Sequence, residues 1–170
     1  MSLQDPRPLI IGGLACAVLA VGMALVPTKR LVLNTTASAP VGFYWLADEA
    51  PAVGDLALVR PPPDLARWLA VRGYLPINVP LIKHVAAVGG QAVCARGDVV
   101  AIDGRVVGKI LKRDLMGRSL RPAGTCRQLS EGEVFLLNPA APRSLDGRYF
   151  GPLPRDCVVG RLLPLWTWER

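Results

Sequence analysis

The sequence of 170 residues contains one histidine, His84, and four cysteines, with no Cys-x-x-Cys pair among them. Protein zinc sites are built mainly from these two residue types at short, characteristic spacings, so we expect neither a metal nor a cofactor. Charged residues are also scarce, at 19% of the chain. The basic residues that give the net charge of +7 are scattered rather than clustered, which argues against nucleic-acid binding.

A long apolar run from residue 9 to residue 26 contains no charge and lies between Arg7 and the Lys29-Arg30 pair. Its 18 residues nearly span the hydrocarbon core of a bilayer, and scattered basic residues suit a protein beside anionic lipid. The run could instead be the apolar region of a cleaved signal peptide, because length alone does not separate the two. We therefore predict a membrane anchor or signal segment over residues 1–27 and one globular domain over residues 28–170.

Glycine and proline together occupy 33 positions (17 and 16), a composition typical of strands joined by tight turns. Alternating or β-branched apolar residues predict strands over 43–46, 55–59, 80–88, 133–138, 157–163 and 165–168, with Pro164 separating the last two. Asp103-Gly104 predicts the turn of a hairpin over residues 98–107. The expected fold class is mostly β, an antiparallel domain.

One short helix interrupts this pattern. Residues 64–72 are expected to be helical, with Asp64 as the N-cap and Gly73 just after the end. Residues 28–37 are expected to form a connector and residues 112–127 a loop, since neither segment shows a clear period.

Three cysteines lie outside the apolar run: Cys94, Cys126 and Cys157. Disulfides form in exported domains, and Cys94 and Cys126 lie on either side of the predicted hairpin. A bridge between them would close a loop of about 30 residues and stabilise the fold by roughly 3 to 4 kcal/mol. We predict this disulfide and leave the state of Cys157 open.

Lysine is the candidate base in this chain, because a hydrolase without usable histidine, cysteine or metal must activate serine or threonine by another group. Lys83 lies in the middle of the predicted strand over residues 80–88, where Leu81 and Val85 share its face and His84 points to the other. Burial would have to lower its pKa by about three units, or roughly 4 kcal/mol, for the amine to be neutral near pH 7. Two alternatives stay open, a lysine that extends to solvent and a Ser-His-Asp triad built on His84.

Three stretches, in this order, resemble motifs of the signal peptidase I superfamily, and in particular of its conjugative transfer (TraF-type) branch: NTTASAPVGFYWL, RGYLPINVPLIKHVAAVGG and RSLDGRYFGPLP. The resemblance covers most of residues 28–168. It implies a signal-peptidase-like β domain in which Ser38 is the nucleophile and Lys83 the general base. It also implies that the Ser38 N–H and the Thr36 hydroxyl form an oxyanion hole.

The third stretch matches the family's Ser-x-Asp-x-Arg pattern at Ser144, Asp146 and Arg148. The resemblance implies that Ser144 orients the lysine and that the acid-base pair supports the site. A structural salt bridge between Asp146 and Arg148 is an alternative that is compatible with this role. The run that begins at Asn138-Pro139 replaces the Gly-Asp-Asn-Arg of general signal peptidases, which favours the conjugative branch.

The resemblance implies a serine endopeptidase held in the inner membrane, with its catalytic domain in the periplasm. Its expected partners are membrane lipid, an exported precursor or conjugative pilin as substrate, and other components of a conjugation or secretion apparatus. Processing of a pilin could end in hydrolysis or in cyclisation, where the pilin ends are joined. Two alternatives are a general type I signal peptidase and a non-catalytic, membrane-tethered scaffold of such an apparatus.

Overall fold

The computed structural model describes residues 10–17, 30–124 and 126–168, and the chain divides into two compact units, Met1–Arg30 and Leu31–Arg170. In the first unit residues 10–17 are helical, and the rest of the apolar run lies outside the described residues. None of the helices in the described ranges has the length and apolar character needed to cross a membrane. The anchor or signal segment over residues 1–27 therefore stays a prediction.

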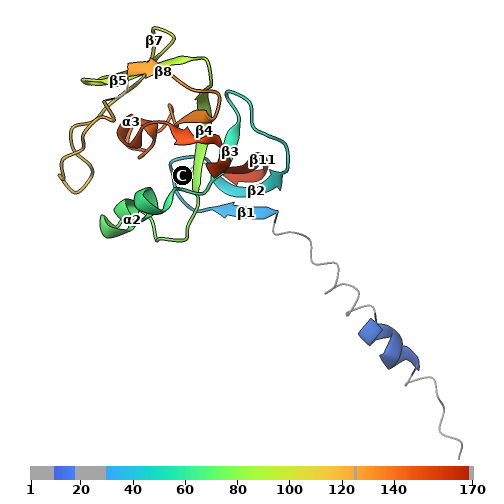
Figure 1. The fold of residues 1–170 in the computed structure, drawn as a ribbon. Helices are drawn as coiled ribbons and strands as arrows, with labels where there is room; N and C mark the ends of the chain where they lie inside the picture. The colour runs from blue at the N-terminus through green and yellow to red at the C-terminus, as the bar shows by residue number, and fades with distance from the viewer. Residues whose placement is uncertain (1–9, 18–29, 125, 169–170) are drawn as a thin grey trace, which may run out of the picture. The chain divides into compact units, whose positions relative to one another are not determined.

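The second unit contains two antiparallel β-sheets (Figure 1). The larger sheet has the strand order β1-β2-β11-β3-β4-β9-β10, and the smaller has the order β7-β6-β5-β8. The strands are β1 (Leu31–Asn34), β2 (Val41–Ala47), β3 (Leu56–Val59), β4 (Leu81–Val88), β5 (Ala92–Arg96), β6 (Val99–Ile102), β7 (Arg105–Lys109), β8 (Cys126–Gln128), β9 (Glu133–Leu137), β10 (Leu153–Pro154) and β11 (Val158–Trp168). The helical elements of this unit are α2 (Pro63–Val71), α3 (Gly147–Phe150) and the 3₁₀ turn η1 (Arg155–Cys157). The mostly β, antiparallel prediction is confirmed.

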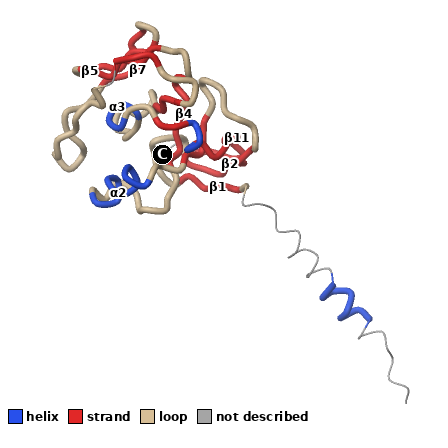
Figure 2. Tube along the Cα trace, in the orientation of Figure 1, coloured by secondary structure: helices blue, strands red, loops and turns tan. Residues whose placement is uncertain are grey.

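Strand β4, labelled in Figure 2, lies inside the larger sheet between β3 and β9. Buried residues alternate along it with half-buried ones. This alternation puts Leu81, Lys83 and Val85 on one face and His84 on the other, as predicted. Leu81 and Val85 belong to a core between the sheet and α2. A second core lies between the two sheets, where Ala87 of β4 packs near residues of β5 and β6. Lys83 thus enters an apolar layer.

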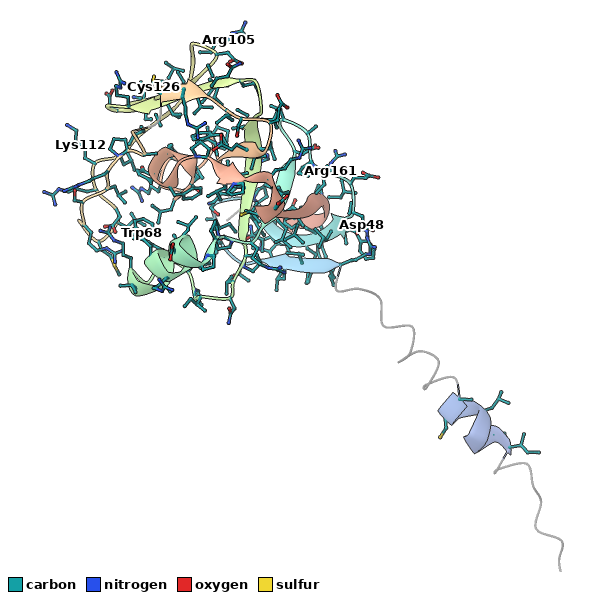
Figure 3. The ribbon with its side chains drawn as sticks, viewed as in Figure 1. Asp48, Trp68, Arg105, Lys112, Cys126 and Arg161 are labelled. Carbon is teal, nitrogen blue, oxygen red and sulfur yellow. A yellow bond between two sulfur atoms is a disulfide. The ribbon has the colours of Figure 1, made fainter. Side chains whose placement is uncertain are left out.

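Helix α2 packs on the sheet through one apolar face. Leu69 is buried, and Trp68 packs against the same core (Figure 3). The helix begins at Pro63 instead of after Asp64, because the fixed φ of proline suits the first helical position and its missing N–H leaves no bond unmade. Gly73, with a φ of +66°, follows the last turn as expected.

The predicted hairpin is formed by β6 and β7. Asp103 and Gly104 have φ values of 49° and 78°, which fit the two-residue turn that suits the twist of paired strands. The strands predicted over residues 80–88 and 133–138 correspond to β4 and β9.

The C-terminal strand differs from the prediction. Residues 158–168 form one strand, β11, rather than two strands separated by Pro164. Beyond Arg161, β11 is paired with β2 on one side and, among the described residues, has no strand on the other. Proline lacks a backbone N–H, and Pro164 is tolerated there because the unpaired edge of the strand requires no hydrogen bond. The register shifts between Pro164 and Trp166, as at a β-bulge. Strand β11 also separates β2 from β3, although the sequence joins those two strands directly by a loop.

Four short strands are not predicted by the sequence: β1, β5, β8 and β10. Strand β1 lies within the expected connector over residues 28–37, and β8 lies at the end of the expected loop over residues 112–127. All residues of β8 are exposed, so this strand lacks the alternation that marks a half-buried strand, and β1 has only four residues. Strand β5 is paired with β6 and β8.

Cys94 and Cys126 form a disulfide between the paired strands β5 and β8, as the sequence predicts (Figure 3). The bridge joins residues 32 positions apart and encloses the β6–β7 hairpin together with the segment that follows it. Cys157 is a half-buried free thiol.

Replacing Cys94 and Cys126 together by alanine removes a constraint on the unfolded chain. We expect the double variant to lose about 3 to 4 kcal/mol of unfolding free energy. Urea denaturation of the full chain in detergent micelles measures this loss. Cys157→Ala is the control and should change the value by less than about 1 kcal/mol. A double variant as stable as the wild type would contradict the stabilising role of the bridge.

Candidate active site

Lys83 is the buried amine at the centre of the candidate site. Its residue exposure is 4%, and Ala57 on β3 is its fully buried partner in the sheet. The amine Nζ donates a 2.6 Å hydrogen bond to Ser144 Oγ. Burial lowers the pKa of Lys83 from 10.5 to about 8, while the charge of Asp146 raises it and that of Arg148 lowers it. The alternative of a lysine that extends to solvent is therefore wrong for this strand.

Asp146 and Arg148 form a bidentate ion pair below Ser144. Arg148 Nε donates to Asp146 Oδ1 and Arg148 Nη2 donates to Asp146 Oδ2, each at 2.8 Å. The side-chain exposures are 1% for the arginine and 0% for the aspartate, so the pair lies wholly out of water. Buried ions need this geometry, since removing one partner commonly costs about 3 to 5 kcal/mol.

The guanidinium of Arg148 also binds the turn that carries Ser144. It donates to the carbonyls of Ala141 at 2.9 Å, Pro142 at 3.1 Å and Ser144 at 3.1 Å. A further bond at 3.0 Å reaches the carbonyl of Lys109, at the end of β7. The Asp146–Arg148 pair is therefore a structural salt bridge, which was one of the two interpretations of these residues. The same pair also positions Ser144, whose hydroxyl contacts Lys83.

Gly147 lets this turn approach β9 closely. A Cβ at this position would lie 2.7 Å from the Leu136 carbonyl and 2.7 Å from the Phe135 ring. A larger residue would push the start of α3 away from the sheet, and Asp146 is the N-cap of that helix.

Ser38 and Thr36 lie on the turn over residues 34–40, which joins β1 to β2. Ser38 is half-buried and Thr36 is exposed. Their hydroxyl oxygens are 3.3 Å apart. The Tyr44 hydroxyl donates a 2.6 Å bond to the Pro40 carbonyl and so fixes the far end of the turn.

Asn138 connects this turn to the strand of Lys83. Its Nδ2 donates to the Ser38 carbonyl at 2.6 Å and to the Ile82 carbonyl at 3.2 Å. Its Oδ1 accepts from the His84 N–H at 3.1 Å, and its own N–H donates to Asp146 Oδ2 at 3.1 Å. The buried Asn138 thus joins the Ser38 turn, both strand neighbours of Lys83 and the ion pair.

The structure brings all six predicted site residues into one hydrogen-bonded network, but it does not join Ser38 to Lys83 directly. Among the described residues, Ser38 Oγ bonds to Thr36 and Lys83 Nζ bonds to Ser144. His84 lies on the opposite face of β4, with Nδ1 3.0 Å from the Gly54 carbonyl. A triad built on His84 would need its ring on the Lys83 face, so the geometry argues against it.

Sequence reasoning missed the two buried asparagines of the site, Asn34 and Asn138. Asn138 attracts notice in the sequence only as a departure from a family motif. A small amide directly after an apolar strand is the available signal, because a buried amide must find hydrogen-bond partners. In residues 10–17, 30–124 and 126–168, no cluster of three or more His, Cys, Asp or Glu side chains could hold a metal ion.

Residues 7–167 match the model of a family described as "Signal peptidase, peptidase S26", and the chain belongs to this family of peptidases. Among similar proteins, the "Plasmid transfer protein TraF" of Escherichia coli is 31% identical over 170 residues, which cover 94% of this chain and 93% of that protein. The "Probable conjugal transfer protein TraF" of Sinorhizobium fredii is 35% identical over 175 residues, covering 95% and 91%. The resemblance to the conjugative branch is confirmed.

A crystal structure of signal peptidase I from Enterococcus faecalis aligns with a TM-score of 0.43 and 21% identity over 69% of this chain and 100% of that one.

Burial of Lys83 lowers stability at neutral pH, because the amine has a pKa of about 8 in the folded chain and 10.5 as its ordinary value. This difference corresponds to about 3 kcal/mol. Between these two values the unfolded chain binds more protons, so the unfolding free energy rises with pH. We expect Lys83→Met to be more stable than wild type by about 1 to 3 kcal/mol at about pH 7, with the gap narrowing above pH 8.

Urea unfolding of both chains at about pH 7 and about pH 10 measures this effect. Lys112→Met changes an exposed lysine and should leave stability within about 0.5 kcal/mol at both values. A Lys83→Met variant that is less stable than wild type at neutral pH would contradict the cost of burying this amine.

Proposed function

We propose that this chain is a serine endopeptidase in which Lys83 is the general base for Ser38. The observation that carries the proposal is the buried Lys83 amine, whose pKa of about 8 leaves roughly a tenth of it neutral near pH 7. Its bond to Ser144 and the link through Asn138 to the Ser38 turn support the assignment. Membership of a peptidase family supports the same chemistry.

The proposed reaction is acyl transfer. Ser38 Oγ turns from Thr36 toward neutral Lys83, gives its proton to Nζ and attacks the scissile carbonyl. The Ser38 N–H and the Thr36 hydroxyl stabilise the oxyanion. Protonated Lys83 then gives its proton to the leaving amine, and a water molecule, deprotonated by Lys83, hydrolyses the acyl-enzyme. If the amino terminus of the substrate attacks instead of water, the product is a ring.

The proposed substrate is a conjugative pilin or a related exported precursor. Relatives that match over more than nine-tenths of this chain are named as plasmid or conjugal transfer proteins, which favours a conjugation substrate over general secretion. Small residues such as alanine before the cut would suit shallow apolar pockets beside an extended strand. Other components of a conjugation apparatus are possible partners of the same chain.

Purified full-length chain in detergent micelles, mixed with the pilin precursor encoded near its gene, should release the mature pilin. We expect Ser38→Ala and Lys83→Ala to abolish cleavage while Lys112→Ala leaves it unchanged. Because only the neutral amine accepts the proton, kcat/KM should rise with pH and level off above about 8. Cleavage by the Lys83→Ala variant would rule out the Ser38/Lys83 pair.

The same assay separates the remaining alternatives. Mass spectrometry of the product distinguishes a linear pilin from a circular one by their difference in mass. Cleavage of a wide panel of secretory precursors would indicate a general signal peptidase. Normal conjugation by cells that carry Ser38→Ala would indicate a scaffold without catalysis.

We also propose that the catalytic domain rests on the periplasmic surface of the inner membrane. Seven exposed apolar side chains on β1, β2 and β11 form what we term the apolar strip: Leu31, Leu33, Trp45, Leu163, Leu165, Trp166 and Trp168. The sheet register sets Leu31, Trp45 and Leu163 side by side across the three strands. Tryptophan is enriched where a protein meets the headgroups of a bilayer. Strand β1 leads directly into the Ser38 turn, so lipid contact here would hold the site near the membrane.

Tryptophan fluorescence of the full chain in vesicles tests this contact. Lipids brominated along the acyl chains should quench the wild type, because Trp166 and Trp168 are 71% and 40% exposed. The triple variant Trp45→Phe/Trp166→Phe/Trp168→Phe, which removes every tryptophan of the apolar strip, should lose most of the quenching. The control, Trp68→Phe on α2, should keep it. Wild-type fluorescence that is the same in brominated and ordinary lipid would contradict the proposal.

A further inference from the structure

Asn34 is a buried amide at the end of β1 whose side chain organises the whole Ser38 turn. Its residue exposure is 3%. The Nδ2 group donates to the carbonyls of Thr36, Ala39 and Pro40, each at 3.0 Å. The Oδ1 atom accepts from the Thr36 N–H at 3.0 Å and from the Thr36 hydroxyl at 2.9 Å. Every polar group of this side chain is therefore used within the turn.

The bond between Asn34 and the Thr36 hydroxyl fixes the direction of two protons. An amide oxygen has no proton to give, so the Thr36 hydroxyl is the donor in that bond. A hydroxyl carries one proton, so in the contact between Thr36 Oγ1 and Ser38 Oγ the donor is Ser38. The relay runs from Ser38 to Thr36 to Asn34. In this arrangement the Ser38 proton is directed to Thr36 Oγ1.

We propose that Asn34 is a positioning residue that acts through Thr36, by holding the Thr36 hydroxyl beside Ser38 and keeping its proton until an oxyanion forms. This inference rests on the proposed function. When Ser38 attacks a carbonyl, the new oxyanion is a charged acceptor and competes with the neutral amide oxygen for the Thr36 proton. Charge-assisted hydrogen bonds are roughly twice as strong as neutral ones, so the proton turns to the oxyanion.

This role separates the two ends of the Asn34 amide. The Nδ2 end shapes the turn, and its loss would lower stability and disturb every step. The Oδ1 end accepts the hydrogen bond of the Thr36 hydroxyl and so orients that hydroxyl. Losing this bond should slow only a step in which an oxyanion forms. Asn34→Asp keeps an acceptor for Thr36 but makes it charged, so it should hold the proton too strongly and lose the Nδ2 bonds as well.

The test uses the full chain in detergent micelles and p-nitrophenyl acetate, a small ester with no peptide part to bind. The acetylation rate of Ser38 is followed by mass spectrometry of the intact protein. We expect Thr36→Val to slow acetylation about 100-fold, the typical loss for one oxyanion donor, and Thr36→Ser to restore most of the rate. Thr35→Val is the matched control, since Thr35 is the exposed neighbour whose side chain makes no hydrogen bond among the described residues.

A double-mutant cycle then isolates the link to Asn34. We expect Asn34→Asp to slow acetylation about 10-fold in the wild type but less than about 3-fold in the Thr36→Val background, because the two residues act as one unit. If Asn34→Asp fails to fold, Asn34→Ser, which has no amide oxygen for Thr36, replaces it in the cycle with the same expectation.

If Asn34→Asp slows acetylation by the same factor with and without Thr36→Val, the inference about Asn34 is overturned. The Ser38/Lys83 proposal would still stand. The same holds if Thr36→Val acetylates as fast as wild type. A wild type that is acetylated no faster than Ser38→Ala would overturn the proposed function and this inference with it.

Discussion

The structure of the candidate site depends on one constraint, the removal of the Lys83 amine from water. A lysine in the middle of a buried strand needs a hydrogen-bond acceptor, and Ser144 Oγ supplies it. Ser144 is in turn held by the Arg148–Asp146 pair, whose remaining donors bind the carbonyls of the same turn. The ion pair lies near enough to influence the pKa of Lys83, but its two charges act in opposite directions, so burial dominates.

The parts of the site come from distant positions in the chain, and buried amides join them. Asn138 forms hydrogen bonds with the Ser38 carbonyl and with both strand neighbours of Lys83. Asn34 forms its hydrogen bonds within the Ser38 turn. In this structure Ser38 Oγ contacts Thr36 and Lys83 Nζ contacts Ser144. The proposed reaction therefore requires Ser38 to turn from Thr36 toward Lys83.

Sequence patterns predict the local elements and miss the long-range pairings. Alternation identifies β4 and the face of Lys83, and Asp103-Gly104 identifies a hairpin, because both signals lie within a few residues. The insertion of β11 between β2 and β3 has no local signal, since it depends on pairing between segments about a hundred positions apart. For the same reason Asn138, whose partner Ser38 is 100 residues away, could not be recognised as part of the site. The motif residues themselves came from resemblance, and their catalytic roles stay predictions.

The proton affinity of Lys83 tests the central claim most directly. The full chain in micelles, labelled with ¹³C at the ε carbon of lysine, gives one NMR signal that disappears in Lys83→Met and thus identifies the residue. Its shift, followed across the pH range, reports the pKa of that amine alone. A midpoint of about 8 is expected if the folded chain keeps the amine out of water. A midpoint near the ordinary 10.5 would mean that the folded chain does not lower the pKa of Lys83, and it would contradict the account.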